Sequence, residues 1–192
     1  MFRIKKIIGR QIIDSRGNPT CEADVILDDG TLGRGAVPSG ASTGKLEAIE
    51  IRDNDPDLYL GKSVNKAVNN INHVISAEIN ASTAFDQESF DKFLIELDGT
   101  SNKERLGANT ILALSIAFAK AIANKNNIQL YQSLTEDSSY MLPIPMMNII
   151  NGGAHANNKL DFQEFMILPI GFDKITESIR AGAEIFHTLK NA

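Results

Sequence analysis

The stretch FRIKKIIGRQIIDSRGNPTCEADVILDDGTLGRGAV, residues 2–37, decides the fold. It holds three runs rich in β-forming residues, 2–13, 20–27 and 32–37, separated by two clusters of turn-forming residues. The second cluster contains Asp29-Gly30, a pair that favours a tight hairpin because both residues tolerate positive φ. Links this short join antiparallel neighbours, so the stretch predicts a three-stranded antiparallel meander.

The spacing of apolar residues becomes helical from residue 61 onward. One apolar face falls within residues 64–75 and a second within 90–97. A third segment, 108–123, is apolar on nearly every side, which predicts a helix buried between the sheet and the other helices. Together these elements predict one α+β domain. The first apolar face comprises Val64, Ala67, Val68, Ile71, Val74 and Ile75.

The chain becomes polar near residues 135–140, and we place a domain boundary there, between 1–134 and 135–192. An extended apolar run follows at 142–150, where Pro143 and Pro145 disfavour a helix. A loop at 151–161, a second apolar run at 165–170 and helical spacing from Ile175 to Leu189 come next. The second segment therefore predicts strand, strand and helix.

Composition excludes several classes of protein. Acidic residues outnumber basic ones 24 to 19 and the basic residues are scattered, which argues against nucleic-acid binding. The one cysteine, Cys21, cannot form a disulfide or a zinc site within the chain and predicts a small strand residue. Gly9 and Arg10 interrupt the apolar start, so we expect no export signal. The apolar run 111–122 is shorter than the roughly 20 residues that span a bilayer, and we expect no membrane span.

The loop 38–44, Pro-Ser-Gly-Ala-Ser-Thr-Gly, is the first candidate for a functional site. Its small residues offer backbone N–H groups and hydroxyls that suit an anion or a hard cation. The alternative is a connector in which Ser42 or Thr43 caps the following short helix.

A second candidate lies after the proposed boundary. Gly152 and Gly153 would let backbone approach a ligand closely, with His155 held just beyond them. If the two apolar runs pair as a hairpin, Gln163 and Glu164 lie near His155, and the carboxylate could act in proton transfer. The alternatives are a solvated histidine and an exposed strand end. The turn that contains Asp14, by contrast, predicts a mainly structural role.

Four segments resemble the enolase family: IIDSRGNPT at 12–20, PSGASTG at 38–44, PMMNIINGG at 145–153 with His155, and QEFM at 163–166. The similarity runs from about residue 4 to the last residue. It implies an α+β N-terminal domain joined to the start of a (β/α)8 barrel. Because such a barrel typically takes about 250 residues, we expect 135–192 to hold an incomplete one.

The resemblance also implies the reversible dehydration of 2-phosphoglycerate to phosphoenolpyruvate with Mg²⁺. In that family the loop with Ser39, Gly40, Ala41, Ser42 and Thr43 closes over the substrate, and the position of Ser42 ligates a second magnesium ion. The positions of His155, Gln163 and Glu164 contact the substrate, and Glu164 assists the departure of hydroxide. A homodimer or larger oligomer, and a cytoplasmic location with a possible cell-surface or secreted fraction, are implied too.

Enolases take the lysine base, the glutamate that protonates the leaving hydroxide and three magnesium-binding carboxylates from later barrel strands. None of these strands is in the 192 residues. We therefore expect the 192-residue chain to be inactive alone. One alternative is a racemase or cycloisomerase of the wider superfamily, which the 38–44 and 151–155 segments disfavour. Another is a non-catalytic, truncated enolase-like interaction domain. Arg16 could contribute to a subunit interface.

Overall fold

The computed structural model describes residues 1–40, 44–137 and 139–191. The chain divides into two compact units, Met1–Glu136 and Asp137–Ala192, which are described separately below. Residues 41–43 of the candidate loop lie outside the described residues.

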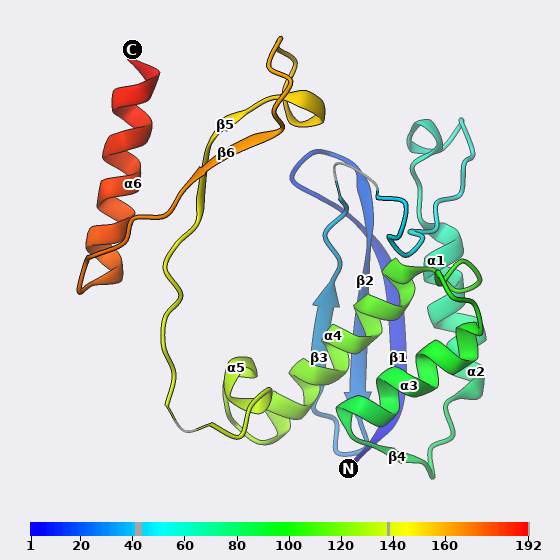
Figure 1. Cartoon of the computed structure of the whole chain (residues 1–192). Coiled ribbons are helices and arrows are strands. Elements are labelled where there is room, and N and C mark those ends of the chain that lie inside the picture. Colours follow the sequence, from blue (N-terminus) through cyan, green and yellow to red (C-terminus); the bar gives the residue numbers. More distant parts are fainter. Residues whose placement is uncertain (41–43, 138, 192) are drawn as a thin grey trace. The chain divides into compact units, whose positions relative to one another are not determined.

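The first unit is built on the expected antiparallel meander, which is confirmed (Figure 1). Strand β1 spans Phe2–Ile13, β2 spans Pro19–Leu27 and β3 spans Leu32–Ala36. A fourth strand, β4 (Ala84–Phe85), pairs with the start of β1 and extends the sheet to the order β3-β2-β1-β4. The sequence analysis did not foresee β4, because two residues carry no detectable alternation.

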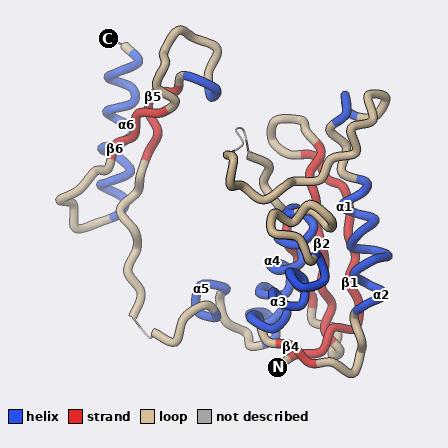
Figure 2. The backbone as a smooth tube through the Cα atoms, turned by 45° about the vertical axis from the view of Figure 1, so that its right-hand side comes forward, coloured by secondary structure: helices blue, strands red, loops and turns tan. Residues whose placement is uncertain are grey.

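Helix α4 (Ala108–Lys125) covers β2 and β3, as expected for a helix that is apolar nearly all round (Figures 1 and 2). Two glycines of β3 allow this close approach. A Cβ on Gly33 would lie 2.1 Å from the carbonyl oxygen of Ala117, and one on Gly35 would lie 2.5 Å from that of Ala113. The helix backbone therefore occupies the space that side chains would need.

Two further helical segments complete the core. Asp86 is the N-cap of helix α3 (Gln87–Asp98), and its carboxylate accepts a hydrogen bond from the backbone N–H of Ser89. The helix carries Phe90 into contact with Phe118 of α4, with ring centroids 4.6 Å apart. The other segment joins α1 (Asn65–Asn69), the π-helix η2 (Asn70–Ile75) and α2 (Ser76–Glu78). The short elements η1 (Tyr59–Gly61) and α5 (Leu130–Ser133) flank these helices in sequence.

The prediction for the first apolar face is wrong at one residue. Ile71 and Ile75 are fully buried, but Val74 is 38% exposed. The reason is local, because a π-helical turn holds more residues than an α-helical turn and α-helical spacing cannot be continued through it.

The second unit contains a two-stranded hairpin and a helix. Strand β5 (Met147–Asn151) pairs antiparallel with β6 (Glu164–Ile167), and α6 (Ile175–Lys190) follows. The first strand starts later than the apolar run, since the two prolines at 143 and 145 cannot donate to a ladder. Short 3₁₀-helix η3 (Gly153–His155) lies between the strands in sequence. No helix of the described residues is long and apolar enough to cross a bilayer.

Candidate functional site

A rigid turn precedes the second strand of the first unit. The Asp14 carboxylate accepts hydrogen bonds from the backbone N–H groups of Arg16 at 2.8 Å and Asn18 at 2.9 Å. The Asn18 hydrogen bond is the main reason that the pKa of Asp14 lies below its usual range. Gly17 supplies the positive φ of 77° that the turn requires. These contacts fix the backbone of the turn, and the mainly structural role of Asp14 stays a prediction.

The turn supports the start of the 38–44 loop. A guanidinium nitrogen of Arg16 donates to the carbonyl oxygen of Ser39 at 2.5 Å. The Ser39 hydroxyl donates to a carboxylate oxygen of Glu50 at 3.1 Å and accepts from Arg52 at 3.0 Å. The loop therefore leaves the sheet from a residue that is held through both its backbone and its side chain.

The chain that returns from the loop is fixed by the region before and at the start of α4. The N–H of Ile49 donates to the carbonyl of Asn102 at 2.8 Å, and the carbonyl of Ile49 accepts from Ala108 at 2.8 Å. The buried amide side chain of Asn109 accepts from the N–H of Ile51 at 3.2 Å and donates to its carbonyl at 3.0 Å. The Asn109 side chain thus makes the two hydrogen bonds to the Ile51 backbone that a neighbouring strand would otherwise make.

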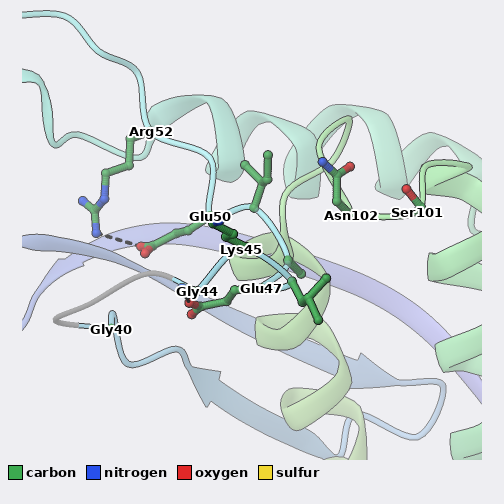
Figure 3. A pocket seen from close by; sticks show the side chains of 11 residues that line it. Gly40, Gly44, Lys45, Glu47, Glu50, Arg52, Ser101 and Asn102 are labelled. Atoms are coloured by element: carbon green, nitrogen blue, oxygen red, sulfur yellow. Dashed lines mark hydrogen bonds and ion pairs between the residues drawn. The ribbon is translucent and has the colours of Figure 1, made fainter.

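A cavity of about 730 Å³ lies beside this segment (Figure 3). Its walls carry charges of both signs, and the dashed line in Figure 3 marks the ion pair between Arg52 and Glu50. A cavity with charged groups in its wall can accept a charged ligand. The charged and amide residues in its wall are Lys45, Glu47, Glu50, Arg52 and Asn102.

In the second unit the hairpin brings two of the candidate residues together. Asn151 pairs with Glu164, and the N–H of Gly152 donates to the carbonyl of Gln163 at 2.9 Å. The Nδ1 atom of His155 lies 2.8 Å from Oε1 of Glu164. The two side chains are only 20% and 28% exposed, whereas Gln163 is exposed. The expected proximity of imidazole and carboxylate is thus observed.

The glycines before His155 have a role within the hairpin itself. A Cβ on Gly152 would lie 2.4 Å from the carbonyl oxygen of Phe162, and Gly153 has a φ of 53°. The sequence had suggested that these glycines admit a ligand. In the structure Gly152 leaves room for residues 160–162, in the loop before β6, and its carbonyl accepts a hydrogen bond from the N–H of His155 at 3.0 Å.

The candidate residues fall in both units. Ser39 and Gly40 belong to the Met1–Glu136 unit, and the hairpin residues belong to the other. Ala41, Ser42 and Thr43 lie outside the described residues. Across residues 1–40, 44–137 and 139–191, no three His, Cys, Asp or Glu side chains are grouped so that they could hold a metal ion.

Sequence reasoning missed Glu50 and Arg52. A weak signal was available, because side chains two residues apart on an extended segment point to the same side, which places Glu50 and Arg52 close enough to pair. Their partners could not have been named, since Arg52 reaches the carbonyl of Pro19, 33 residues earlier.

Comparison with known families agrees with this arrangement. Residues 4–134 match the family described as Enolase, N-terminal domain, and residues 139–192 match Enolase, C-terminal TIM barrel domain. The first match alone covers more than half of the chain, and the motif-bearing loop, turn and hairpin all lie within the two matches. The chain belongs to the enolase family.

Proposed function

We propose that these residues form part of an enzyme that reversibly dehydrates 2-phosphoglycerate to phosphoenolpyruvate. The observation that carries the proposal is the 2.8 Å contact between His155 and Glu164 at the end of the hairpin. A half-buried carboxylate beside an imidazole is a grouping suited to proton transfer at a bound substrate.

The contact also suggests how each side chain acts. When Nδ1–H of His155 donates to Glu164, the ring is held in one orientation and Nε2 is left for the substrate. In its protonated form the imidazole could donate to a phosphate oxygen. We assign Glu164 to the departure of hydroxide, and we assign Gln163, whose side chain is exposed, to a hydrogen bond with the substrate.

We propose that the 38–44 loop, with Ser39, Gly40, Ala41, Ser42 and Thr43, covers the substrate, and that Ser42 binds Mg²⁺. Enolases use Mg²⁺, which stabilises negative charge that develops on the substrate. The carboxylates of the described residues do not form a cage for this ion. Glu164 is engaged by His155, and Glu50 by Arg52 and Ser39.

Enzymes of this family take their lysine base and main metal ligands from later barrel strands, so we propose that the 192 residues alone do not turn over substrate. The test compares this chain with the full product of its gene, following phosphoenolpyruvate formation from 2-phosphoglycerate and Mg²⁺. We expect turnover by the full product and none by the 192 residues. Absence of turnover by the full product would refute the proposed function.

Variants of the full product then test the assigned residues. We expect Glu164→Gln and His155→Asn to lower kcat by about 10²- to 10⁴-fold, the usual contribution of a general acid or base. Glu184→Gln is the matched control, because Glu184 is an exposed carboxylate that pairs with Arg180 on α6. Equal activity of Glu164→Gln and Glu184→Gln would contradict the role of Glu164.

We also propose a homodimer or larger oligomer for the full product, located in the cytoplasm. A single, buried cysteine is compatible with a reducing compartment. Light scattering during size-exclusion chromatography would give the oligomeric state, and a monomeric mass would contradict the proposal.

A further inference from the structure

Arg52 joins four separate segments of the first unit. One of its terminal nitrogens donates to the carbonyl of Pro19 at 3.1 Å and to the carbonyl of Lys62. The other donates to the hydroxyl of Ser39 at 3.0 Å and to the carboxylate of Glu50 at 2.7 Å. The side chain is 20% exposed, so most of it is withdrawn from water.

Ser39 and Glu50 are the two ends of the segment 39–50, which begins within the 38–44 loop. They are 11 residues apart in the chain, yet the Ser39 hydroxyl donates to Glu50 at 3.1 Å. Arg52 contacts both members of this pair and ties them to Pro19 and Lys62. The two ends of the segment are thereby fixed to each other and to the body of the unit.

These contacts require an arginine. A guanidinium group presents donors in a planar fork and can serve carbonyl, hydroxyl and carboxylate acceptors at once. A lysine ammonium keeps the positive charge, but it is a single point with three donors and cannot occupy both ends of the fork. The variant Arg52→Lys keeps the positive charge but loses the fork geometry, so it separates the effects of the two.

We infer that Arg52 is a positioning residue, which holds Ser39 and Glu50 so that the described residues between them, 40 and 44–49, keep one placement along the wall of the adjacent cavity. This inference rests on the proposed function, in which the 38–44 loop faces the substrate. Arg52 itself touches neither substrate nor metal in this scheme, and it acts through Ser39 and Glu50.

The first test measures amide hydrogen exchange in the 192-residue chain. The N–H groups of Ile49, Ile51 and Asp53 are hydrogen bonded, so their exchange reports local opening of the returning segment. We expect Arg52→Lys to accelerate exchange at these amides by about ten-fold relative to those of β2. Ile75→Val is the control, because Ile75 is fully buried away from the cavity lining and its truncation lowers stability without touching the network.

If Arg52→Lys does not fold, Glu50→Gln replaces it, since this change keeps the size of the side chain and removes the charge that pairs with Arg52. Selective acceleration at the three amides in either variant supports the inference. Acceleration spread evenly over the unit, as in Ile75→Val, would overturn it and leave Arg52 as a stabilising residue only.

The second test uses the full gene product and separates KM from kcat. We expect Arg52→Lys to raise KM for 2-phosphoglycerate by about five-fold with a smaller effect on kcat, because the cavity wall at residues 44–50 is misplaced while the reacting groups remain. Ile75→Val should leave KM unchanged, and a KM of Arg52→Lys equal to that of Ile75→Val would overturn the inference. If the wild-type product shows no turnover, the proposed function fails, whereas the exchange experiment still decides whether Arg52 fixes the segment.

Discussion

Asp24 lies buried on β2 between two guanidinium groups. Arg34 donates to its carboxylate at 2.7 and 3.0 Å, and Arg10 donates to it as well. Burial alone would raise the pKa of Asp24, but the hydrogen bonds from Arg34 and Arg10 outweigh it and lower the pKa to about 2. The carboxylate is therefore held in its charged form.

This lowered pKa predicts an acid-dependent loss of stability. In the unfolded chain Asp24 returns to its usual pKa of 3.8, so the unfolded state binds the proton first as the pH falls. The stabilisation is complete above about pH 5 and is lost progressively toward about pH 2. Urea unfolding between these pH values should show the decline, and Asp24→Asn should make it shallower while costing about 1–3 kcal/mol near neutrality.

If the free energy of unfolding depended on acid pH equally in the wild type and in Asp24→Asn, the contribution assigned to Asp24 would be contradicted. The variant should reduce the decline without abolishing it, because other carboxyl groups have lowered pKa values too. These are Asp14, Asp29, Asp53, Asp86 and Asp98.

At the same scale, sequence reasoning succeeded where the partners lie on one hairpin and failed where they are remote. The proximity of His155 and Glu164 follows from pairing two adjacent strands, which the apolar runs already indicated. The network around Arg52 depends on where four segments meet, and no local pattern encodes that meeting. The two-residue spacing of Glu50 and Arg52 indicated that they share one side of the chain, but it indicated none of the remote partners of Arg52.

At the scale of elements, the contact between β3 and α4 is sensitive to a single methyl group. Gly33→Ala would place a Cβ 2.1 Å from the carbonyl oxygen of Ala117, so strand and helix must separate. We expect a loss of about 1–3 kcal/mol in the free energy of unfolding, measured with urea.

Gly44→Ala is the matched control for this substitution. A Cβ at position 44 would meet no neighbour closer than a carboxylate oxygen of Glu47 at 4.0 Å. Its effect should stay within about 0.5 kcal/mol. Equal stability of Gly33→Ala and Gly44→Ala would show that the helix can move away from β3 at no cost.

The main strands were predictable nearly to the residue, since turn-forming residues separate each strand from the next. Helix α4 was equally clear from its length and apolar character. The extent of β5 was overestimated, because an apolar run shows that residues avoid water but does not show which of them pair. Strand β4 depends on tertiary contact with β1 and had no signal of its own.

At the scale of the whole molecule, the two units differ in how well they cover their apolar residues. The first unit buries a continuous core that includes Phe90, Leu94 and Phe118. In the second unit many large apolar side chains remain exposed, on the hairpin, on α6 and in the segments between. They include Met141, Leu142, Phe162, Phe165, Ile170, Ile179, Phe186 and Leu189.

This difference predicts the course of limited proteolysis of the 192-residue chain. Poorly covered segments open more readily, so the first cuts should fall within residues 141–192 and leave a resistant fragment that begins at Met1. Mass spectrometry of the fragments identifies the sites. Cuts distributed evenly over both units, or uniform resistance, would contradict the prediction.

The burial of Cys21 has a practical consequence. This thiol is the only one in the chain, it is 0% exposed on β2, and burial raises its pKa to about 12. A disulfide reagent needs an accessible thiolate and should react only when the sheet of the first unit opens. Labelling of Cys21 would thus time the opening of that unit without any introduced probe, and Gly33→Ala should shorten the labelling time while cleavage within residues 141–192 leaves it unchanged.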